Sequence, residues 1–265
     1  MLVLMLHKLI GVLCAMVLLW ALSVRLKRMA ILDIFWGLAI IAIAIASTVQ
    51  GPADLRSLLL CAAVGVWGLR LSLHLALRQR KQGEDKRYAH MLKKRGEHFR
   101  LRSLYSVFFV QGVLLWLITL PIQRLALEGS EATWLPSDIA GASLMSLGLL
   151  IEVVADAQLA LFGRKPENKT KVLHHGLWRY SRHPNYFGEW LFWWGVFIVS
   201  LASGATWTMV SPLLLTGLLL HVSGIRPLER TITARRPEYQ QYIEQTSAFI
   251  PWFAPAQLDE NPQEP

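Results

Sequence analysis

The sequence has few of the residues and motifs that metal-binding and soluble nucleotide-binding proteins use. It contains 2 Cys, Cys14 and Cys61, both in apolar runs without CxxC or Cys/His spacing, so we expect neither a disulfide framework nor a metal site. No Gly-x-Gly-x-x-Gly follows a predicted strand and no Walker loop is present, which excludes the two common soluble nucleotide folds. Charged residues make up only 17% of the chain, and no internal repeat or low-complexity tract is visible.

Long apolar runs dominate the chain instead. Hydrophobic residues make up 54% of it, and 11 Trp are among them. About seven of these runs have the length that a helix needs to cross a bilayer, roughly 20 residues. They are residues 2–23, 31–49, 56–77, 104–123, 137–162, 185–203 and 206–224. The sequence therefore predicts an all-α, polytopic, integral membrane protein with about seven transmembrane helices, forming a single membrane domain over residues 1–265.

The net charge of +9 belongs to this topology rather than to a nucleic-acid surface. Lys and Arg gather in three loops between apolar runs, at residues 25–28, 78–102 and 164–182, while the alternate loops are poor in both. Cytoplasmic loops carry the excess of Lys and Arg in membrane proteins. We therefore expect the N-terminus outside and the C-terminus in the cytoplasm, with membrane lipid and no nucleic acid as partners.

The most informative stretch is Gly176–Trp194, which reads GLWRYSRHPNYFGEWLFWW. Pro184 suits the first turn of a helix, and the free N–H groups and positive dipole end of that helix favour an anion nearby. Arg182, Asn185 and Glu189 are spaced i, i+3 and i+7, which predicts one shared helix face. A carboxylate such as Glu189 is costly in lipid and usually functional. The alternative is a basic, aromatic anchor at the membrane interface that positions a helix.

Within this stretch, RHPNYFGE resembles the RHPNYxGD/E signature of membrane-embedded, NADPH-dependent steroid and sterol reductases. The flanking GLWRYSRHPNYFGE is most similar to the bacterial branch of the steroid 5-alpha-reductase-like family, and this resemblance implies a bacterial inner-membrane location. A shorter form, RHPxYxG, also occurs in isoprenylcysteine carboxyl methyltransferases, but Asn185 and Glu189 favour the reductases. The resemblance extends over residues 156–253, which we expect to form the cofactor-binding region.

The resemblance implies NADPH as cofactor and a hydrophobic small-molecule substrate that reaches the protein from the bilayer. It implies reduction of a carbon–carbon double bond, of enone or enoyl type, in a lipid- or steroid-like molecule. Together with the pattern of cations and polar groups, it gives the candidate cofactor-binding residues Arg70, Arg78, Asp156, Arg164, Trp178, Arg179, Arg182, His183, Asn185, Tyr186, Glu189, Tyr239 and Tyr242.

Two of the predicted spans carry polar side chains that allow more than one interpretation. Arg70 in span 56–77 and Arg78 just after it belong to one polar face. Either Arg78 is a loop charge and Arg70 an interface arginine paired with an acid, or both are cations leading toward an anionic cofactor. In span 137–162, Glu152 and Asp156 are four residues apart and need cations, such as Arg70 or Arg182, or a ligand donor. The reductases have an Asn and an Asp at this spacing, so Asp156 matches and Glu152 departs from the pattern. A structural ion pair is the alternative.

The proton donor is the open point of the reductase interpretation. Steroid 5-alpha-reductases use a glutamate on the second helix and a tyrosine on the third, whereas Trp67 stands at the tyrosine's place here. Asp33, Tyr88 and Tyr105 are the candidates, and Asp33 is equally suited to stabilise a helix start. We take Asp33 and Tyr88 as the candidate catalytic residues.

Two other functions remain alternatives to a reductase. The first is an S-adenosylmethionine-dependent methyltransferase of the isoprenylcysteine type, with Glu229 as its downstream glutamate. The second is a lipid-binding membrane protein without enzymatic activity. The last residues, 255–265, are acidic and rich in Pro, and we expect them to be disordered.

Overall fold

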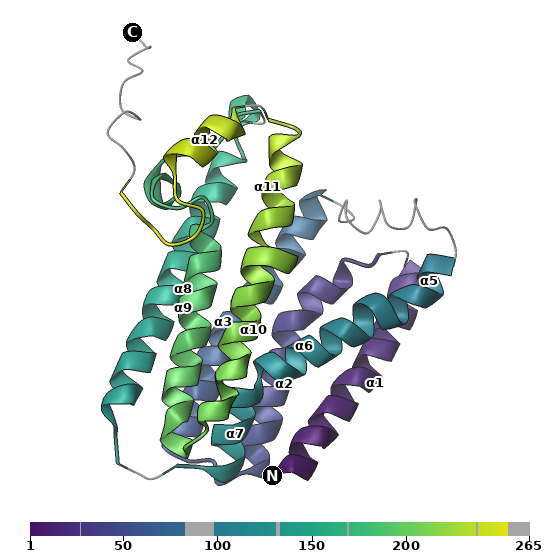
Figure 1. The fold of residues 1–265 in the computed structure, drawn as a ribbon. Helices are drawn as coiled ribbons and strands as arrows, with labels where there is room; N and C mark the ends of the chain where they lie inside the picture. The colour runs from purple at the N-terminus through teal and green to yellow at the C-terminus, as the bar shows by residue number, and fades with distance from the viewer. Residues whose placement is uncertain (27, 83–97, 131–132, 169, 237, 254–265) are drawn as a thin grey trace. The chain divides into compact units, whose positions relative to one another are not determined.

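The computed structural model describes the whole chain except residues 27, 83–97, 131–132, 169, 237 and 254–265 (Figure 1). Every regular element within the described residues is a helix, which confirms the all-α prediction. Six of the described helices are long and apolar enough to cross a membrane, so the protein is a multi-pass integral membrane protein. The predicted disorder of 255–265 lies outside the described residues.

The chain divides into two compact units, which are described separately. Unit 1 comprises Met1–Asp138 and Phe197–Ser211, and unit 2 comprises Ile139–Val196 and Pro212–Pro265. The helices are α1 Leu2–Leu26, α2 Ile31–Gln50, α3 Leu55–Gln82, α5 His98–Ser103, α6 Val110–Ile118, α7 Leu120–Glu128, α8 Pro136–Phe162, α9 Pro184–Ser200, α10 Val210–Gly217, α11 Ile225–Thr233 and α12 Tyr239–Gln245. Two π-helical segments, Leu104–Phe109 and Leu218–Val222, continue into α6 and follow α10.

Two predicted spans differ from the structure. The span predicted at 104–123 is too long, because α6 ends at Ile118 and a separate helix, α7, begins after Thr119. Pro121 sits in the first turn of α7, where its missing N–H costs nothing, but it could not continue α6. The span predicted at 185–203 corresponds to α9, which has 17 residues and is not among the six. That length is at the lower limit of the roughly 17–25 residues that cross a bilayer.

Small residues let the first helices of unit 1 approach closely. A Cβ added to Gly37 of α2 would lie 2.2 Å from the carbonyl oxygen of Gly68 in α3. Next to this contact the Ser72 hydroxyl donates to the carbonyl of Ile34 at 2.8 Å. Such small-residue contacts, with hydroxyls bonded across the helices, are typical of association in membranes, where lipid gives no hydrophobic drive between helices.

One end of unit 1 is held by a buried arginine–carboxylate pair. Arg56, in the first turn of α3, donates from Nε and Nη2 to the two carboxylate oxygens of Asp138 at 2.7 and 2.8 Å. The same guanidinium donates to the carbonyl of Thr133 at 2.8 Å and to the hydroxyl of Ser130. Because both side chains are almost fully buried, the pair ties the start of α3 to the start of α8.

Beside this pair, Asp54 caps α3. Its Oδ1 accepts the backbone N–H of Ser57 at 2.7 Å, and its Oδ2 accepts the N–H of Ser130 at 2.8 Å. An aspartate at this position satisfies one of the N–H groups that a helix start leaves without an intrahelical partner.

In unit 2, α8 and α9 lie side by side through two glycine pairs (Figure 1). A Cβ on Gly188 would lie 2.6 Å from the carbonyl oxygen of Gly148, and one on Gly195 would lie 2.6 Å from that of Gly141. The two glycines of each helix are seven residues apart and lie on one face, so the helix backbones are in contact over two turns. On the other side of α9, the Trp190 indole donates to the Thr216 hydroxyl of α10 at 2.9 Å, as the predicted hairpin of these spans requires.

Candidate functional site

The turn before α9 is seated on the last turns of α8. Gly176 has a positive φ of +64°, and a Cβ there would lie 2.4 Å from the amide nitrogen of Gln158. The Gln158 Oε1 accepts the backbone N–H of Leu177 at 3.0 Å, and the Trp178 indole donates to the Ala155 carbonyl at 3.1 Å. Only glycine suits the first of these positions, both in backbone conformation and in space. The sequence GLW thus fixes the turn against the last turns of α8, at Ala155 and Gln158.

The helix α9 begins at Pro184, as predicted. Asn185 and Glu189 both lie on α9 and are four residues apart, so they share a helix face. The prediction that Arg182 shares this face is wrong, since this residue precedes the proline and lies outside the helix. The position of its side chain therefore depends on the conformation of the turn and not on the helical spacing of α9.

Arg182 is bound to Glu229 of α11. Its Nε donates to Glu229 Oε1 at 2.7 Å and its Nη2 to Oε2 at 3.2 Å. His183 Nε2 donates to the same Oε1 at 3.0 Å. The sequence made Arg182 one of the candidate partners of Glu152 and Asp156, and the structure pairs it with Glu229. Two neighbouring basic side chains therefore meet one carboxylate, all three buried or half-buried.

The last described part of the chain, residues 239–253, is bonded along this turn, and we refer to it as the strap. The N–H of Arg182 donates to the carbonyl of Ser247 at 2.8 Å, and its Nη1 donates to the carbonyls of Ile243, at 3.0 Å, and Thr246. The Ser181 hydroxyl donates to the Phe249 carbonyl at 2.8 Å. Arg182 thus carries both the ion pair with α11 and the attachment of the strap.

Tyr239 and Tyr242, at the start of the strap, are each 5% exposed. The Tyr242 hydroxyl donates to the Trp178 carbonyl, and the two tyrosine rings meet edge to face with centroids 5.5 Å apart. Burial, and next the Glu229 carboxylate, raise the pKa of Tyr239 above its usual value. Burial, and next the neighbouring Tyr239, raise that of Tyr242. Both tyrosines are therefore neutral, and Tyr242 donates to the turn that precedes α9.

Asn185 connects α9 with α8. Its Nδ2 donates to Asp156 Oδ1 at 3.2 Å. One helical turn before Asp156, Glu152 is 3% exposed, and its backbone lies against Gly188. Close approach of the two helices at this glycine brings an amide and carboxylates, including the half-buried Glu189 of α9, to the head of α9.

The remaining predicted residues of unit 2 surround this arrangement. His183 and Tyr186 stack with ring centroids 5.5 Å apart and planes 8° from parallel. Trp178 is buried, Arg179 is half-buried and Arg164 is exposed. The structure thus brings together Asp156, Trp178, Arg182, His183, Asn185, Tyr186, Tyr239 and Tyr242 through the contacts given above.

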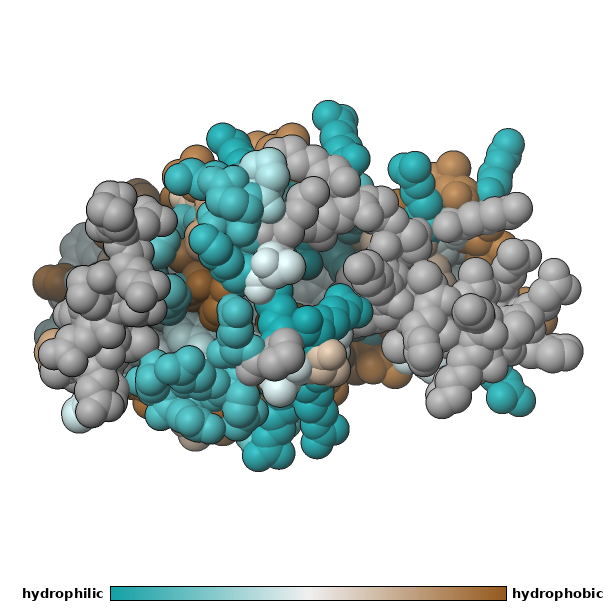
Figure 2. Space-filling view, turned by 90° about the horizontal axis from the view of Figure 1, so that it is seen from above, coloured by the Kyte–Doolittle hydropathy of each residue, from teal (hydrophilic) through white to brown (hydrophobic). Residues whose placement is uncertain are grey.

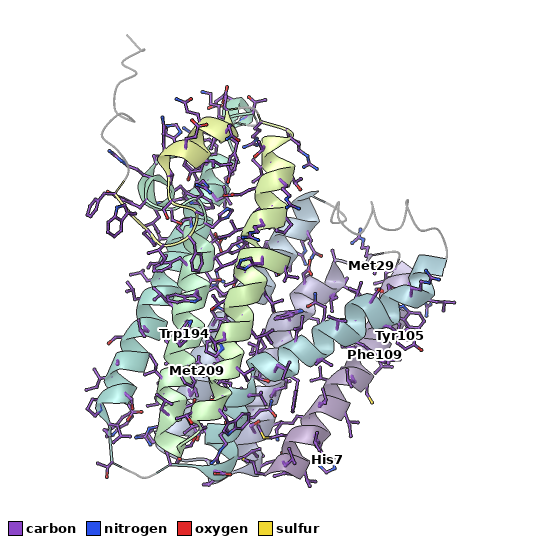
Figure 3. All side chains as sticks on the ribbon, in the orientation of Figure 1. His7, Met29, Tyr105, Phe109, Trp194 and Met209 are labelled. Atoms are coloured by element: carbon purple, nitrogen blue, oxygen red, sulfur yellow. The ribbon has the colours of Figure 1, made fainter. Side chains whose placement is uncertain are left out.

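The other predicted residues belong to unit 1. Arg70 and Arg78 lie on α3, the first half-buried and the second exposed. Asp33 lies in the first turn of α2. Tyr105 is 65% exposed and stands beside Phe109, with ring centroids 5.4 Å apart (Figure 3). Tyr88 lies outside the described residues, so its catalytic role stays a prediction, as does that of Asp33.

Several residues that hold the site are not among the candidates that the sequence gives. Glu229 is a candidate only for the methyltransferase alternative, and neither Gln158 nor the glycines of α8 and α9 is a candidate site residue. The glycines had a signal that could have found them, since Gly141 and Gly148 are seven residues apart, like Gly188 and Gly195. Glu229 had none, because its partner Arg182 is 47 residues away in the chain.

The donor set is one of arginines, carboxylates, an amide and hydroxyls. The part of the chain that the structure describes contains no cluster of three His, Cys, Asp or Glu able to hold a metal ion. Such a set suits an organic ligand with both anionic and hydroxyl groups, because arginine binds phosphate or carboxylate and the acids accept from hydroxyl or amide groups.

Comparison with known proteins gives a family without an assigned activity. The family described as Protein of unknown function (DUF1295) matches residues 19–246. No curated protein and no solved structure matches the chain. The match covers most of the sequence, both units included, and the chain therefore belongs to the family DUF1295.

Proposed function

We propose that the protein is a membrane-embedded, NADPH-dependent reductase that acts on a carbon–carbon double bond in a lipid- or steroid-like substrate. The observation that carries this proposal is the hydrogen bond from Asn185 to Asp156. It joins at one point the two helices whose polar residues resemble the cofactor-binding residues of the steroid reductases. The helix start at Pro184 adds the positive end of the α9 dipole beside these side chains.

The residues of unit 2 fit a phosphorylated nicotinamide cofactor with one adjustment. Glu229 already neutralises Arg182. The groups that would bind the phosphates are therefore Arg179, the exposed Arg164 and the N-terminal end of α9. Asn185, Asp156 and Glu189 carry the acceptors and the amide that ribose hydroxyls and a carboxamide need. When bound, the cofactor would supply hydride, and the protein would supply orientation, exclusion of water and a proton.

The proposal is tested by thermal-shift titration of the detergent-solubilised protein with NADPH, NADH and S-adenosylmethionine. A ligand that binds only the folded state, at a free concentration 100 times its Kd, raises the free energy of unfolding by about 2.7 kcal/mol, which is easily measured. We expect NADPH to raise the apparent unfolding temperature of the wild type. Asn185→Ala and Glu189→Ala should both lose this response. The ligand-free proteins should remain folded, with a modestly lower unfolding temperature for Asn185→Ala because it loses the hydrogen bond to Asp156.

Glu167→Gln is the matched control, because Glu167 is an exposed carboxylate in the short 3-10 helix Pro166–Asn168 of the same basic loop. It should respond to NADPH as the wild type does. If Asn185→Ala and Glu189→Ala also respond as the wild type, the proposed cofactor site is wrong. If no ligand stabilises the wild type, the alternative of a lipid-binding protein without enzymatic activity is favoured.

One observation favours the second candidate, an S-adenosylmethionine-dependent methyltransferase. That family shares the RHPxYxG turn and a downstream glutamate, and here Glu229 is bonded to both Arg182 and His183 of the turn. The same titration separates the two functions, because stabilisation by S-adenosylmethionine alone would support the methyltransferase and exclude the reductase.

A further inference from the structure

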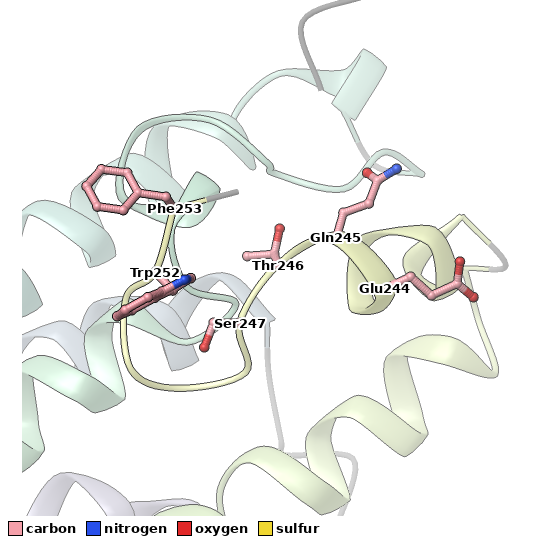
Figure 4. Close-up of a pocket in the computed structure, with 6 residues that line it drawn as sticks. All are labelled: Glu244, Gln245, Thr246, Ser247, Trp252 and Phe253. Carbon is pink, nitrogen blue, oxygen red and sulfur yellow. The ribbon is translucent and has the colours of Figure 1, made fainter. Parts of the chain in front are cut away.

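The end of the strap presents large apolar side chains outward. Ile250, Trp252 and Phe253 are 59%, 71% and 82% exposed, and Tyr180 of the adjoining turn is 39% exposed. Figure 4 shows the rings of Trp252 and Phe253 on one side of an open cleft of about 530 Å³, with Glu244 and Gln245 on its other side. Leaving this much apolar surface in water is unfavourable.

This apolar patch is held in place by ordered contacts. The N–H of Trp252 donates to the carbonyl of Tyr180 at 2.9 Å, and the Phe253 ring meets the Tyr180 ring edge to face at 6.3 Å. Just before it, Phe249 lies edge to face against both Phe187 and Trp190 of α9, at 5.7 and 5.9 Å. The exposure of the patch is therefore built into the fold of unit 2.

The position of the patch points to one occupant. It is tied to Tyr180, four residues before the start of α9, and to the first turns of α9, so it lies at the level where this apolar helix begins. In an integral membrane protein a helix end of this kind lies near the headgroups. Trp and Tyr are enriched at that level, because their rings are amphipathic. Seen from above, many of the described side chains are hydrophilic, which is typical of a water-facing end (Figure 2).

We infer that Tyr180, Ile250, Trp252 and Phe253 form a membrane-interface anchor whose partner is the lipid interface of the same bilayer. The anchor holds the end of the strap, while the middle of the strap is bonded to Arg182. Lipid contact therefore fixes the segment that covers the RHPN turn. This inference does not depend on the ligand of the site, and it goes beyond the proposed reductase activity.

The test measures the surroundings of single labelled positions in lipid nanodiscs. In a background with Cys14→Ser and Cys61→Ser, the variant Ile250→Cys is labelled with an environment-sensitive fluorophore, and Phe253→Cys serves as a second position if the first does not fold. The matched control is Glu244→Cys, because Glu244 is exposed on the same strap and lines the opposite side of the cleft.

We expect the label at 250 or 253 to emit at shorter wavelength than the label at 244. A nitroxide placed on the lipid near the headgroup should quench it several-fold more strongly, and aqueous iodide should quench it less. Equal emission and equal iodide quenching at all three positions would overturn the inference. Shielding at 250 and 253 without any quenching by the lipid nitroxide would also overturn it, because a second protein surface would then cover the patch.

Discussion

Each of the two units contains one buried arginine–carboxylate pair, and the two pairs differ in the groups that surround them. In both, the arginine Nε lies 2.7 Å from a carboxylate oxygen and the guanidinium also reaches backbone carbonyls. Arg56 and Asp138 are 5% and 3% exposed, and both lie in the first turns of long helices. Arg182 and Glu229 are 8% and 16% exposed and link a turn, a helix and the strap.

The difference is in the donors that the acids accept. Around Arg56, Asp54 and Asp138 lie in one cluster, and each acid also accepts backbone N–H groups. Glu229 instead accepts from the side chains of Arg182 and His183, which both belong to the turn before α9. A cluster of acids that is satisfied by backbone donors is suited to holding helices together. The Glu229 cluster is suited to fixing the turn that leads to Asn185, next to the proposed ligand.

The largest effect is expected from breaking the pair of unit 1. Arg56→Ala leaves Asp138 buried without its arginine, and breaking a buried pair in this way costs about 3–5 kcal/mol. Thermal unfolding in detergent should therefore show a much lower apparent unfolding temperature. The shift that NADPH produces in the purified variant should remain, because Arg56 takes no part in the proposed site.

The double variant Arg56→Met with Asp138→Leu sharpens this test, because it removes both charges at once. Replacing a buried ion pair by apolar residues is often neutral or stabilising. We expect it to recover part of the lost unfolding temperature. An Arg56→Ala protein that unfolds at the wild-type temperature would contradict the structural role of the pair.

Breaking the pair of unit 2 is expected to lower the stability less than breaking that of unit 1, and to weaken ligand binding more. Glu229→Gln keeps the size and one acceptor of the side chain but removes its charge, which should cost about 1.5–3 kcal/mol. Arg182 keeps the carbonyls of Ile243 and Thr246, so the strap stays attached, but the turn that leads to Asn185 loses its ion pair with α11 and is held less firmly beside the proposed ligand. The ligand-induced thermal shift should therefore decrease along with the unfolding temperature.

Glu244→Gln serves as the control for this comparison, since Glu244 is an exposed carboxylate of the strap. It should leave both quantities unchanged. A Glu229→Gln protein with lower stability and an undiminished ligand shift would show that the second pair is only a structural clamp, like the first.

Much of the fold could be predicted because local patterns determine it. The apolar runs set the positions of most spans, and proline set the start of α9 at Pro184. The end of α6 was missed because Thr119 and Leu120 continue the apolar pattern, whereas the break depends on Pro121 and on the hydroxyl of Thr119, which turns back to the carbonyls of Leu115 and Trp116.

The site could be predicted only in part, because its partners are distant in sequence. The helical spacing placed Asn185 and Glu189 on one face, and the resemblance indicated Asp156 as a cofactor contact, but the bond between Asn185 and Asp156 comes from the structure alone. The partner of Arg182 depends on the packing of α11 and the strap against the turn, which no local pattern encodes. Charge alone suggested the nearer acids of α8, and the structure selects Glu229 of α11.

The smallest effect on stability is expected from Asp54. Changing this residue tests the cap of α3 apart from the neighbouring ion pair of Arg56 and Asp138. Burial by itself raises the pKa of the Asp54 carboxyl, but the N–H and hydroxyl donors of Ser57 and Ser130 outweigh it and hold the pKa below its usual value. Because the folded pKa is then lower than the unfolded one, about 3.9, the carboxylate contributes stability above that pH. This contribution is lost as the pH falls through the lower, folded pKa.

Asp54→Asn should therefore lower the unfolding temperature at neutral pH only slightly, by less than the roughly 1 kcal/mol that loss of a helix cap costs, because Asn also caps helices. The difference from the wild type should stay constant above about pH 5 and shrink as the pH falls below about 3.9, since protonation makes the wild-type side chain neutral as well. Thermal unfolding at a series of pH values measures this. A difference that stays constant across the series would mean that the charge of Asp54 contributes nothing and that only its shape caps the helix.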